Sequence, residues 1–318
     1  FADVSGFTAL SEKLQQRSGA QGTETLTVVI NDFFATMLEI LAKSDGQLLK
    51  FAGDAMLAFF PASGVPDDLT DAHKAIRTGL RMQRAMKEHF QPVRNDQLVA
   101  VLGSDHGSSL MMSIGIARER LFEVLVGNQV QRDHLIQGEL PGLAMQAEGV
   151  GDHDEVIVDA DLAQAVSGQF RSQPLAEGFF QIVDDFGDNL DDYEFELLRR
   201  RRGKGGALFD LETVNLLDNL IQLANRVGVV SRYVAPNVLH DLVHSKDFHL
   251  KSENRYTVTL FCHATGFAEL LREWGDDHLN LVASLLGRFY NIVQRIITTH
   301  GGTLARTDPY KLGTKYLV

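Results

Sequence analysis

The sequence predicts an α+β protein that contains two copies of one fold. The heptapeptide Phe1–Phe7 recurs as Phe261–Phe267, displaced by 260 residues, and both copies keep the aromatic ends and the glycine. Apolar runs with the length of strands alternate along the chain with segments of helical periodicity. A length of 318 residues is enough for two domains of ordinary size.

The repeat continues beyond this first motif, in the same order. The pair Phe33–Phe34 is echoed by Phe289–Tyr290 after 256 residues, and the run Gly53–Leu57 by Gly313–Leu317 after 260 residues. The second copy has therefore lost four residues in a helix and gained four in a hairpin around Asp308–Pro309. Matches in one order, with compensating changes in length, indicate a duplicated structural unit.

Each element of the first copy follows from its local pattern. A strand over Phe1–Val4 leads into a helix that starts near Thr8, and a second helix covers residues 24–44. The runs 48–52 and 55–60 are strands, and the Gly53–Asp54 pair between them predicts a hairpin turn. We further expect an amphipathic helix over 71–90 and strands over 110–117, 121–126 and 155–158.

The same patterns predict the domain organisation. We expect a first domain over residues 1–205, a mainly helical linker over 206–254 and a second domain over 255–318, which opens with a strand at Arg255–Leu260. Nothing equivalent to that strand precedes Phe1, and the second copy stops at Val318. We therefore expect the first domain to be cut short at its opening strand and the second at its C-terminal end.

Composition and charge exclude several classes of protein. Lysine and arginine number 30 against 42 aspartates and glutamates, which gives a net charge of -12. Such an acidic chain lacks the cationic surface that supplies affinity for nucleic acid. No run reaches the roughly 18 apolar residues of a membrane span, and the single cysteine, Cys262, excludes an intrachain disulfide framework. We expect a soluble, cytoplasmic protein.

Two carboxylates are candidates for a metal site. Asp3 ends a strand just before a glycine turn that opens a helix, and Asp54 lies at the tip of the predicted hairpin. If that hairpin lies beside the first strand, the two carboxylates converge next to a helix N-terminus. Carboxylates bind magnesium, and free N–H groups at a helix start bind phosphate. Taken alone, each aspartate is more often a helix cap or a turn residue.

The residues together resemble a known family. The segments Phe1–Thr8 and Lys50–Ala55 resemble the two metal-binding motifs of class III nucleotidyl cyclases, most closely those of the soluble, bicarbonate-type adenylyl cyclases and their bacterial relatives. The resemblance covers most of residues 1–165 and, more weakly, 255–318. It implies two ferredoxin-like cyclase homology domains that pair head to tail within the chain, with ATP bound at their interface.

The resemblance also implies roles for individual residues. Two magnesium or manganese ions would be bound by Asp3, Asp54 and the backbone carbonyl of Val4, and the substrate phosphates would contact Gly6, Phe7, Thr8 and Gly53. The implied reaction is attack of the ribose 3′-oxygen of ATP on its α-phosphate, giving cyclic AMP and pyrophosphate, the reaction of a phosphorus–oxygen lyase. Electrostatic stabilisation of the phosphoryl group would dominate catalysis.

The chain departs from the family pattern in two places. In the second copy the metal positions hold His263 and Thr314, so only the first copy can bind the metal pair. The family also uses an asparagine and an arginine on a helix that follows a Val-Gly strand. In the first copy the comparable strand ends at Val126–Gly127, and Gln131 and Leu135 stand where that pair is expected.

Two lysines are candidates for a second ligand site. In bicarbonate-sensitive relatives a lysine at the position of Lys50 holds the activating anion; a salt bridge or a solvated strand residue explains Lys50 equally well. The arginine that partners it in those relatives has no clean match, since Arg132 is near and His134 aligns. In the second copy Tyr310 aligns with Lys50, and the adjacent Lys311 is the candidate for the lysine that selects the base.

Two functions follow from these features. The first is an adenylyl cyclase in intracellular signalling, active in the intact protein and doubtful in this segment alone. The second is a catalytically inactive module that binds nucleotide or an anion and regulates domains beyond Val318. The two hypotheses differ in whether the second copy, in its unseen part, carries the asparagine and arginine.

Overall fold

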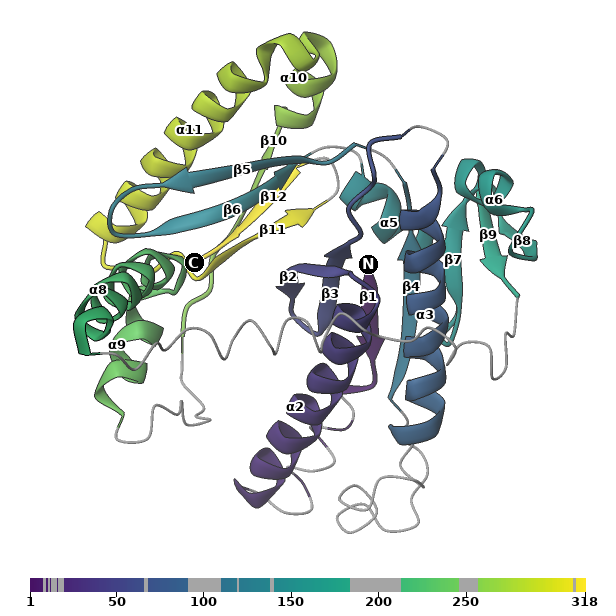
Figure 1. Ribbon diagram of the computed structural model, residues 1–318, viewed down its shortest axis with the longest axis horizontal. Helices are drawn as coiled ribbons and strands as arrows, with labels where there is room; N and C mark the ends of the chain where they lie inside the picture. The colour runs from purple at the N-terminus through teal and green to yellow at the C-terminus, as the bar shows by residue number, and fades with distance from the viewer. Residues whose placement is uncertain are drawn as a thin grey trace. The chain divides into compact units, whose positions relative to one another are not determined.

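The computed structural model describes residues 1–7, 10, 12, 16, 20–65, 68–90, 110–118, 120–137, 140–183, 213–245, 257–310 and 313–318. The chain forms two compact units (Figure 1). Unit 1 contains Phe1–Glu119 and Leu143–Phe195, and unit 2 contains Arg120–Gly142 and Glu196–Val318. Among the described helices, none has the length and apolar character needed to span a membrane.

Unit 1 is built on a seven-stranded mixed sheet with the order β2-β3-β1-β4-β7-β9-β8. The strands are β1 (Ala2–Ser5), β2 (Gln47–Ala52), β3 (Ala55–Phe59), β4 (Met111–Ile116), β7 (Val156–Asp159), β8 (Ser172–Ala176) and β9 (Phe179–Ile182). Only β4 and β7 pair in parallel; the other neighbours are antiparallel. The predicted strands and the hairpin turn at residues 53–54 are confirmed, whereas β8 and β9 were not predicted.

Two long helices, α2 (Ala20–Lys43) and α3 (Thr70–His89), bury their apolar stripes in the core of unit 1. They lie side by side over the sheet (Figure 1), and both confirm helices expected from periodicity. Phe33 of α2 is fully buried, and its ring meets those of Phe7 and Phe90 edge to face at 5.7 and 5.5 Å. This aromatic cluster fixes the residues just after β1 against α2.

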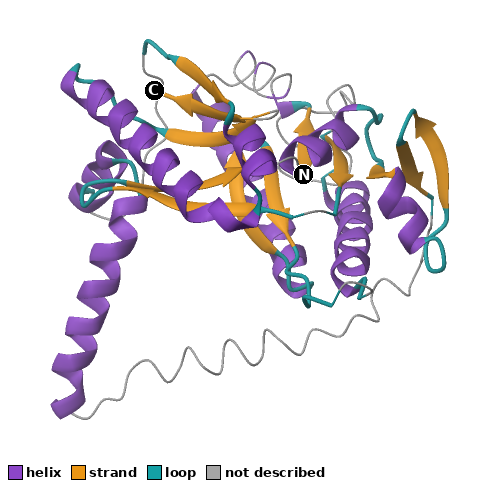
Figure 2. Cartoon of the chain, turned by 90° about the horizontal axis from the view of Figure 1, so that it is seen from above, coloured by secondary structure: helices purple, strands orange, loops and turns teal. Residues whose placement is uncertain are grey.

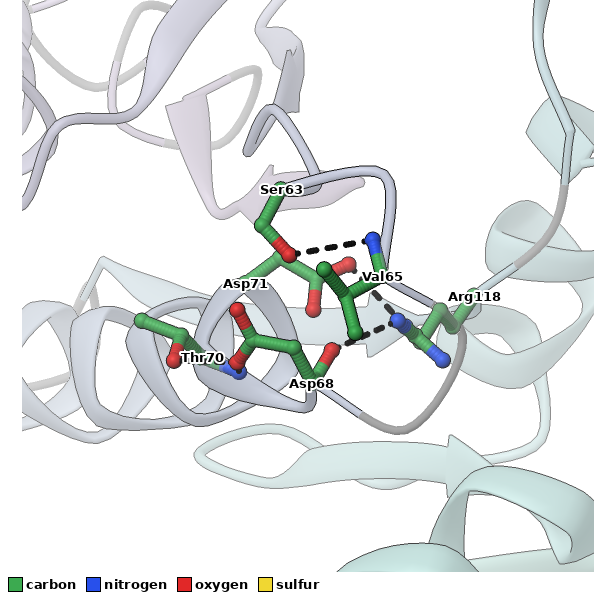
Figure 3. A network of polar contacts seen from close by, with 6 residues as sticks. All are labelled: Ser63, Val65, Asp68, Thr70, Asp71 and Arg118. Atoms are coloured by element: carbon green, nitrogen blue, oxygen red, sulfur yellow. Dashed lines mark hydrogen bonds and ion pairs between the residues drawn. The ribbon is translucent and has the colours of Figure 1, made fainter.

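The start of α3 is tied to the residue that follows β4. Asp68 Oδ1 accepts hydrogen bonds from the backbone N–H and the hydroxyl of Thr70, at 2.9 and 2.5 Å. Arg118 donates through Nη2 to the carbonyl oxygen of Asp68 at 2.8 Å, and its Nε pairs with Asp71 Oδ2 at 2.9 Å (Figure 3). Hydrogen bonds from Thr70 and Ser63 lower the pKa of Asp68 to about 2.

Unit 2 repeats the topology of the first strands of unit 1. Its three-stranded sheet has the order β10 (Phe261–Thr265), β12 (Gly313–Leu317), β11 (Arg306–Tyr310), which matches β1-β3-β2. The helix α11 (Leu279–Thr299) takes the place of α2 and follows the short α10 (Phe267–Trp274). The prediction of a strand over residues 255–260 is wrong for its described part, residues 257–260, which is not assigned to a strand. The strand begins at Phe261, and only Leu260 extends the ladder, by two hydrogen bonds with Val318.

The strand register locates the length change between the two copies. Met56 pairs with Phe51 and with Ala2, while Tyr316 pairs with Thr307 and with Cys262. Beyond the equivalent pairs Phe51–Met56 and Thr307–Tyr316, the first hairpin has one further pair before its turn and the second has three, a difference of two pairs. The four extra residues are thus confirmed and lie within the two strands. The residues Asp308 and Pro309 belong to strand β11, and the turn at 311–312 falls outside the described residues.

A hairpin from the first copy's sequence belongs to unit 2. Its strands are β5 (Phe122–Gly127) and β6 (Arg132–Gln137), and Val126 and Leu135 pack with α11 and Tyr316 in the second core. Thr307 donates to Asp133 Oδ2 at 2.5 Å, and Gln137 bonds to Thr314. The alignment of Gln131 and Leu135 with the helical asparagine and arginine of the family is therefore wrong: Gly127 (φ 106°) starts a turn into β6, so both residues lie on a hairpin.

The helix that the hairpin precedes is α5 (Leu140–Gly149), and a further short helix, α6 (Ala160–Val166), follows β7. The predicted linker is helical where it is described, over α8 (Thr213–Val230), η3 (Ser231–Tyr233) and α9 (Pro236–His244); Figure 2 shows α8 as one unbroken helix. The acidic run Asp184–Asp192 and the basic run Arg199–Gly206 of the sequence lie outside the described part of the chain.

The hairpin contact can be tested with two leucines of the same hairpin. Leu135 is 1% exposed in the core of unit 2, whereas Leu125 is 64% exposed. We expect Leu135→Ala to lower the free energy of unfolding by about 2–5 kcal/mol and Leu125→Ala to change it by less than about 0.5 kcal/mol. Urea unfolding followed by the fluorescence of Trp274, the only tryptophan and part of this core, reports the difference. Equal effects would show that the hairpin does not pack there.

The network at the start of α3 predicts an acid-dependent contribution to stability. Because the folded pKa of Asp68 is below its ordinary 3.8, its contribution is present above pH 3.8 and is lost as the pH falls towards 2. We expect Asp68→Ala to lower the melting temperature at pH 7 and the difference from wild type to vanish near pH 2. Glu177→Ala, in the exposed β8–β9 turn, serves as the control. A difference that persists unchanged at pH 2 would contradict this role.

Candidate active site

Strand β1 presents Asp3 on the face of the sheet opposite the core. Ala2 and Val4 are buried in the core, and the alternate residues Asp3 and Ser5 point the other way. Across the ladder Asp3 is paired with Ser113 of β4. The backbone N–H of Val4 hydrogen-bonds to the Asp3 carboxylate. The carboxylate is therefore held at a fixed place on a central strand.

A left-handed glycine turns the chain from β1 into the following helix. Gly6 has φ 100°, a conformation that side chains other than glycine rarely adopt. The next residue, Phe7, is anchored in the core against Phe33, so the turn is fixed on both sides. The equivalent Gly266 in unit 2 has φ 99°. Thr8, the remaining member of the predicted phosphate-binding turn, lies outside the described residues.

The second aspartate lies on the turn between β2 and β3. Gly53 adopts φ 76° and Asp54 beside it is exposed. Because β3 is the neighbour of β1, with Met56 paired to Ala2, this turn lies next to Asp3. The charge of Asp54 is close enough to act on the pKa of Asp3. The structure therefore brings together the two carboxylates that the sequence singles out.

A third carboxylate, which the sequence analysis missed, also faces Asp3. Glu148 comes from α5 and accepts a hydrogen bond from the hydroxyl of Ser113. Burial, then the negative charges of Glu148 and Asp54, raise the pKa of Asp3 from 3.8 to about 6, against the opposing effects of the Val4 N–H and of His153. No local sequence pattern identifies Glu148 as part of the site, because its position depends on how α5 packs over β4.

This excess of negative charge fits a divalent cation. Magnesium and manganese prefer oxygen ligands, and a cation would favour the ionised form of Asp3 that the protein alone disfavours. The donors available are the carboxylates of Asp3 and Asp54, with the Val4 carbonyl on the same strand. In the described part of the chain, no group of three or more histidine, cysteine or acidic side chains is close enough to hold a metal by itself. Glu148 is thus a neighbour of the pair and not a third ligand.

Of the two candidate lysines, the structure describes Lys50. Lys50 is a half-buried residue of β2 that already interacts with a neighbouring group. It pairs with Leu57, and the equivalent pair in unit 2 is Arg306 with Leu317. The alignment of Tyr310 with Lys50 is therefore wrong, because the extra residues come after this position. Arg306 Nε pairs with Asp308 Oδ2 at 2.9 Å. Lys311 lies outside the described residues.

The equivalent positions in unit 2 carry no acidic pair. His263 is an exposed residue of β10 opposite Lys315, and Thr314 is buried in β12 and bonded to Gln137. The helix α5 of the first copy, Leu140–Gly149, contains neither asparagine nor arginine. Where the structure describes the chain, the acidic pair is thus confined to unit 1.

Sequence comparison gives the family to which unit 1 and its acidic pair belong. Residues 1–181 match the family described as "Adenylate and Guanylate cyclase catalytic domain". The chain belongs to this class III cyclase family. The family includes cyclases of both nucleotides, so membership alone does not fix the substrate.

Individual relatives match part of the chain. Adenylate cyclase type 10 of Oryctolagus cuniculus is 23% identical over 165 residues, which is 52% of this chain and 9% of that protein. An adenylate cyclase of Anabaena cylindrica is 25% identical over 150 residues, 47% of this chain and 26% of that protein. The chain thus spans a small part of the curated relatives it matches.

Among solved structures, the adenylyl cyclase CyaB from P. aeruginosa is similar, with 25% identity, 59% of this chain and 93% of that chain covered, and a TM-score of 0.48. The guanylate cyclase domain of RhGC from Catenaria anguillulae, in complex with GTP, is 17% identical with a TM-score of 0.44, and the match covers 57% of this chain and 92% of that chain.

The raised pKa of Asp3 predicts how the metal-free protein responds to pH. An acid whose folded pKa, about 6, exceeds its ordinary 3.8 contributes stability below pH 3.8 that is lost as the pH rises through 6. We expect Asp3→Asn to raise the melting temperature in EDTA at pH 7.5 and to have no such effect near pH 4. Manganese should stabilise wild type more than the variant.

The control for this prediction is Asp161→Asn, on the exposed face of α6, which should follow wild type at both pH values. Melting curves that show the same pH dependence for wild type and Asp3→Asn would contradict the electrostatic account of the site.

Proposed function

We propose that this chain contains the metal-bearing half of an adenylyl cyclase, which converts ATP to cyclic AMP and pyrophosphate. The observation that carries the proposal is the pairing of Asp3 and Asp54 beside the left-handed turn at Gly6, within a domain of the cyclase family. Preference for ATP over GTP is supported by the names of the relatives, which are adenylate cyclases. We place the protein in the cytoplasm on its single cysteine.

The proposed reaction forms a bond between the ribose 3′-oxygen and the α-phosphorus. The bond from that phosphorus to the bridging oxygen breaks, pyrophosphate leaves, and the 3′-hydroxyl loses its proton. Two magnesium or manganese ions would activate the attacking oxygen and stabilise the leaving group. Asp3, Asp54 and the carbonyl of Val4 would hold them, and the turn at Gly6, Phe7 and Thr8, with Gly53, would contact the phosphates.

The partner half of the site would come from the second copy. The β5–β6 hairpin, residues 122–137, supports intramolecular pairing, because a segment of the first copy's sequence forms part of the core of unit 2. Lys311 is our candidate for recognition of the base. Lys50 is our candidate for binding bicarbonate or a similar anion, because it stands at the position of the anion-binding lysine in the bicarbonate-type cyclases that the sequence resembles.

A second candidate function is a catalytically inactive module that binds nucleotide or an anion. The absence of asparagine and arginine from α5 and the neutral Thr314 in the second copy leave one possible site per chain, and this function applies if the second copy does not supply the asparagine and arginine of that site. Such a module would bind triphosphate without turnover and regulate other domains of the protein.

A product assay separates the two functions. Full-length protein is incubated with ATP or GTP and either magnesium or manganese, with and without bicarbonate, and the cyclic nucleotides are quantified. We expect cyclic AMP from wild type and a loss of about 100-fold or more in Asp54→Asn, because the charge that holds the metal is removed. Asp161→Asn should keep full activity.

Cyclic GMP as the main product would overturn the proposed substrate. Triphosphate binding without any product in wild type would overturn the enzyme and leave the inactive module.

A further inference from the structure

A histidine from outside the family-like motifs lies beside the glycine turn. His153 is in the turn between α5 and β7, and its Nδ1 is 3.1 Å from the hydroxyl oxygen of Ser5, the last residue of β1. Its side chain is exposed. The ring therefore stands at the entrance of the same turn that would receive phosphate.

The backbone that carries His153 is firmly held. Asp154 has φ 73°, and its N–H donates to the carbonyl of Met112 at 2.9 Å. The carbonyl of Glu155 accepts from Ile114 N–H at 3.0 Å and from the side chain of Gln83, which is buried and also bonds to the Met112 carbonyl at 2.7 Å. These bonds fix the turn to β4, the strand next to β1, so the position of the imidazole is set by the sheet.

The imidazole of His153 is a hydrogen-bond donor that stands among carboxylates. The charge of His153 acts on Asp3 and lowers its pKa, against the carboxylates of Asp54 and Glu148. With Nδ1 beside Ser5, the second ring nitrogen has no hydrogen-bond partner among the described residues. When Ser5 donates to Nδ1, or when the ring is protonated, Nε2 carries a hydrogen and donates to an acceptor.

We propose that His153 binds the β- and γ-phosphates of the nucleoside triphosphate and then the pyrophosphate product. The inference rests on the proposed function and adds a residue to it. A polyphosphate brings several negative charges next to three carboxylates, and an imidazole N–H at the turn offsets part of that repulsion with a charge-assisted hydrogen bond. Ser5 acts as the positioning residue, since its hydroxyl orients the ring.

Binding measurements test this role without relying on turnover. Isothermal titration calorimetry of the full-length protein with manganese uses two probes, pyrophosphate and 3′-deoxy-ATP, which lacks the attacking hydroxyl. We expect His153→Ala to weaken both by about tenfold, in the range of one hydrogen bond to a charged group. His153→Arg should restore most of the affinity, and Ser5→Ala should weaken it less than His153→Ala. In assays, KM for ATP should rise more than kcat falls.

The control is His300→Ala, an exposed histidine at the end of α11, which should leave both affinities unchanged. A His153→Ala protein with a lower melting temperature but unchanged affinity for both probes would show a purely structural role and overturn the inference alone. Wild-type protein that binds neither probe would overturn the proposed function together with it.

Discussion

The double pairing of β1 is the constraint on which the core and the site of unit 1 both depend. The strand has only four residues, and it is bonded to β3 on one side and to β4 on the other. The side chains of a strand that is paired on both edges point alternately to the two faces of the sheet. In β1 the residues on the core face are apolar, and Asp3 lies on the other face. A slip of one residue would move Asp3 into the core in place of Val4, which the cost of burying a carboxylate forbids. The packing of the core thereby specifies where the acidic residue stands.

The site is a place where the fold tolerates an unfavourable interaction. Three carboxylates, Asp3, Asp54 and Glu148, come from separate elements, and burial together with the charges of Glu148 and Asp54 raises the pKa of Asp3 to about 6. Repulsion between the carboxylates lowers the stability of the fold, and the burial of the aromatic and aliphatic core beneath them offsets this loss. Charge repulsion that survives in a well-packed domain indicates selection for a ligand, because a cation changes the repulsion into coordination.

The features that could be predicted from sequence are those with local periodicity or with an internal copy to compare. The strands around Gly53–Asp54, the helices α2 and α3, and the convergence of Asp3 with Asp54 follow from such patterns. The place of the β5–β6 hairpin, residues 122–137, in unit 2 did not, because alternation shows which residues face one side of a strand and not which core that side joins. Glu148 and His153 also escaped notice, since they approach β1 only through the packing of α5 and β7 on β4.

The longer hairpin of the second copy explains why the candidate metal site lies in one copy. By strand register Thr314 is the counterpart of Asp54, but the second hairpin is two residue pairs longer, so Thr314 pairs with Pro309 and Ala264 inside the sheet and the pair Tyr310–Gly313 follows it. It is 2% exposed and bonded to Gln137, a residue of the first copy's hairpin. A carboxylate at this position would be buried between strands, without the exposure that Asp54 has at its turn. The change in hairpin length, more than the loss of an acidic residue, thus makes the duplication asymmetric.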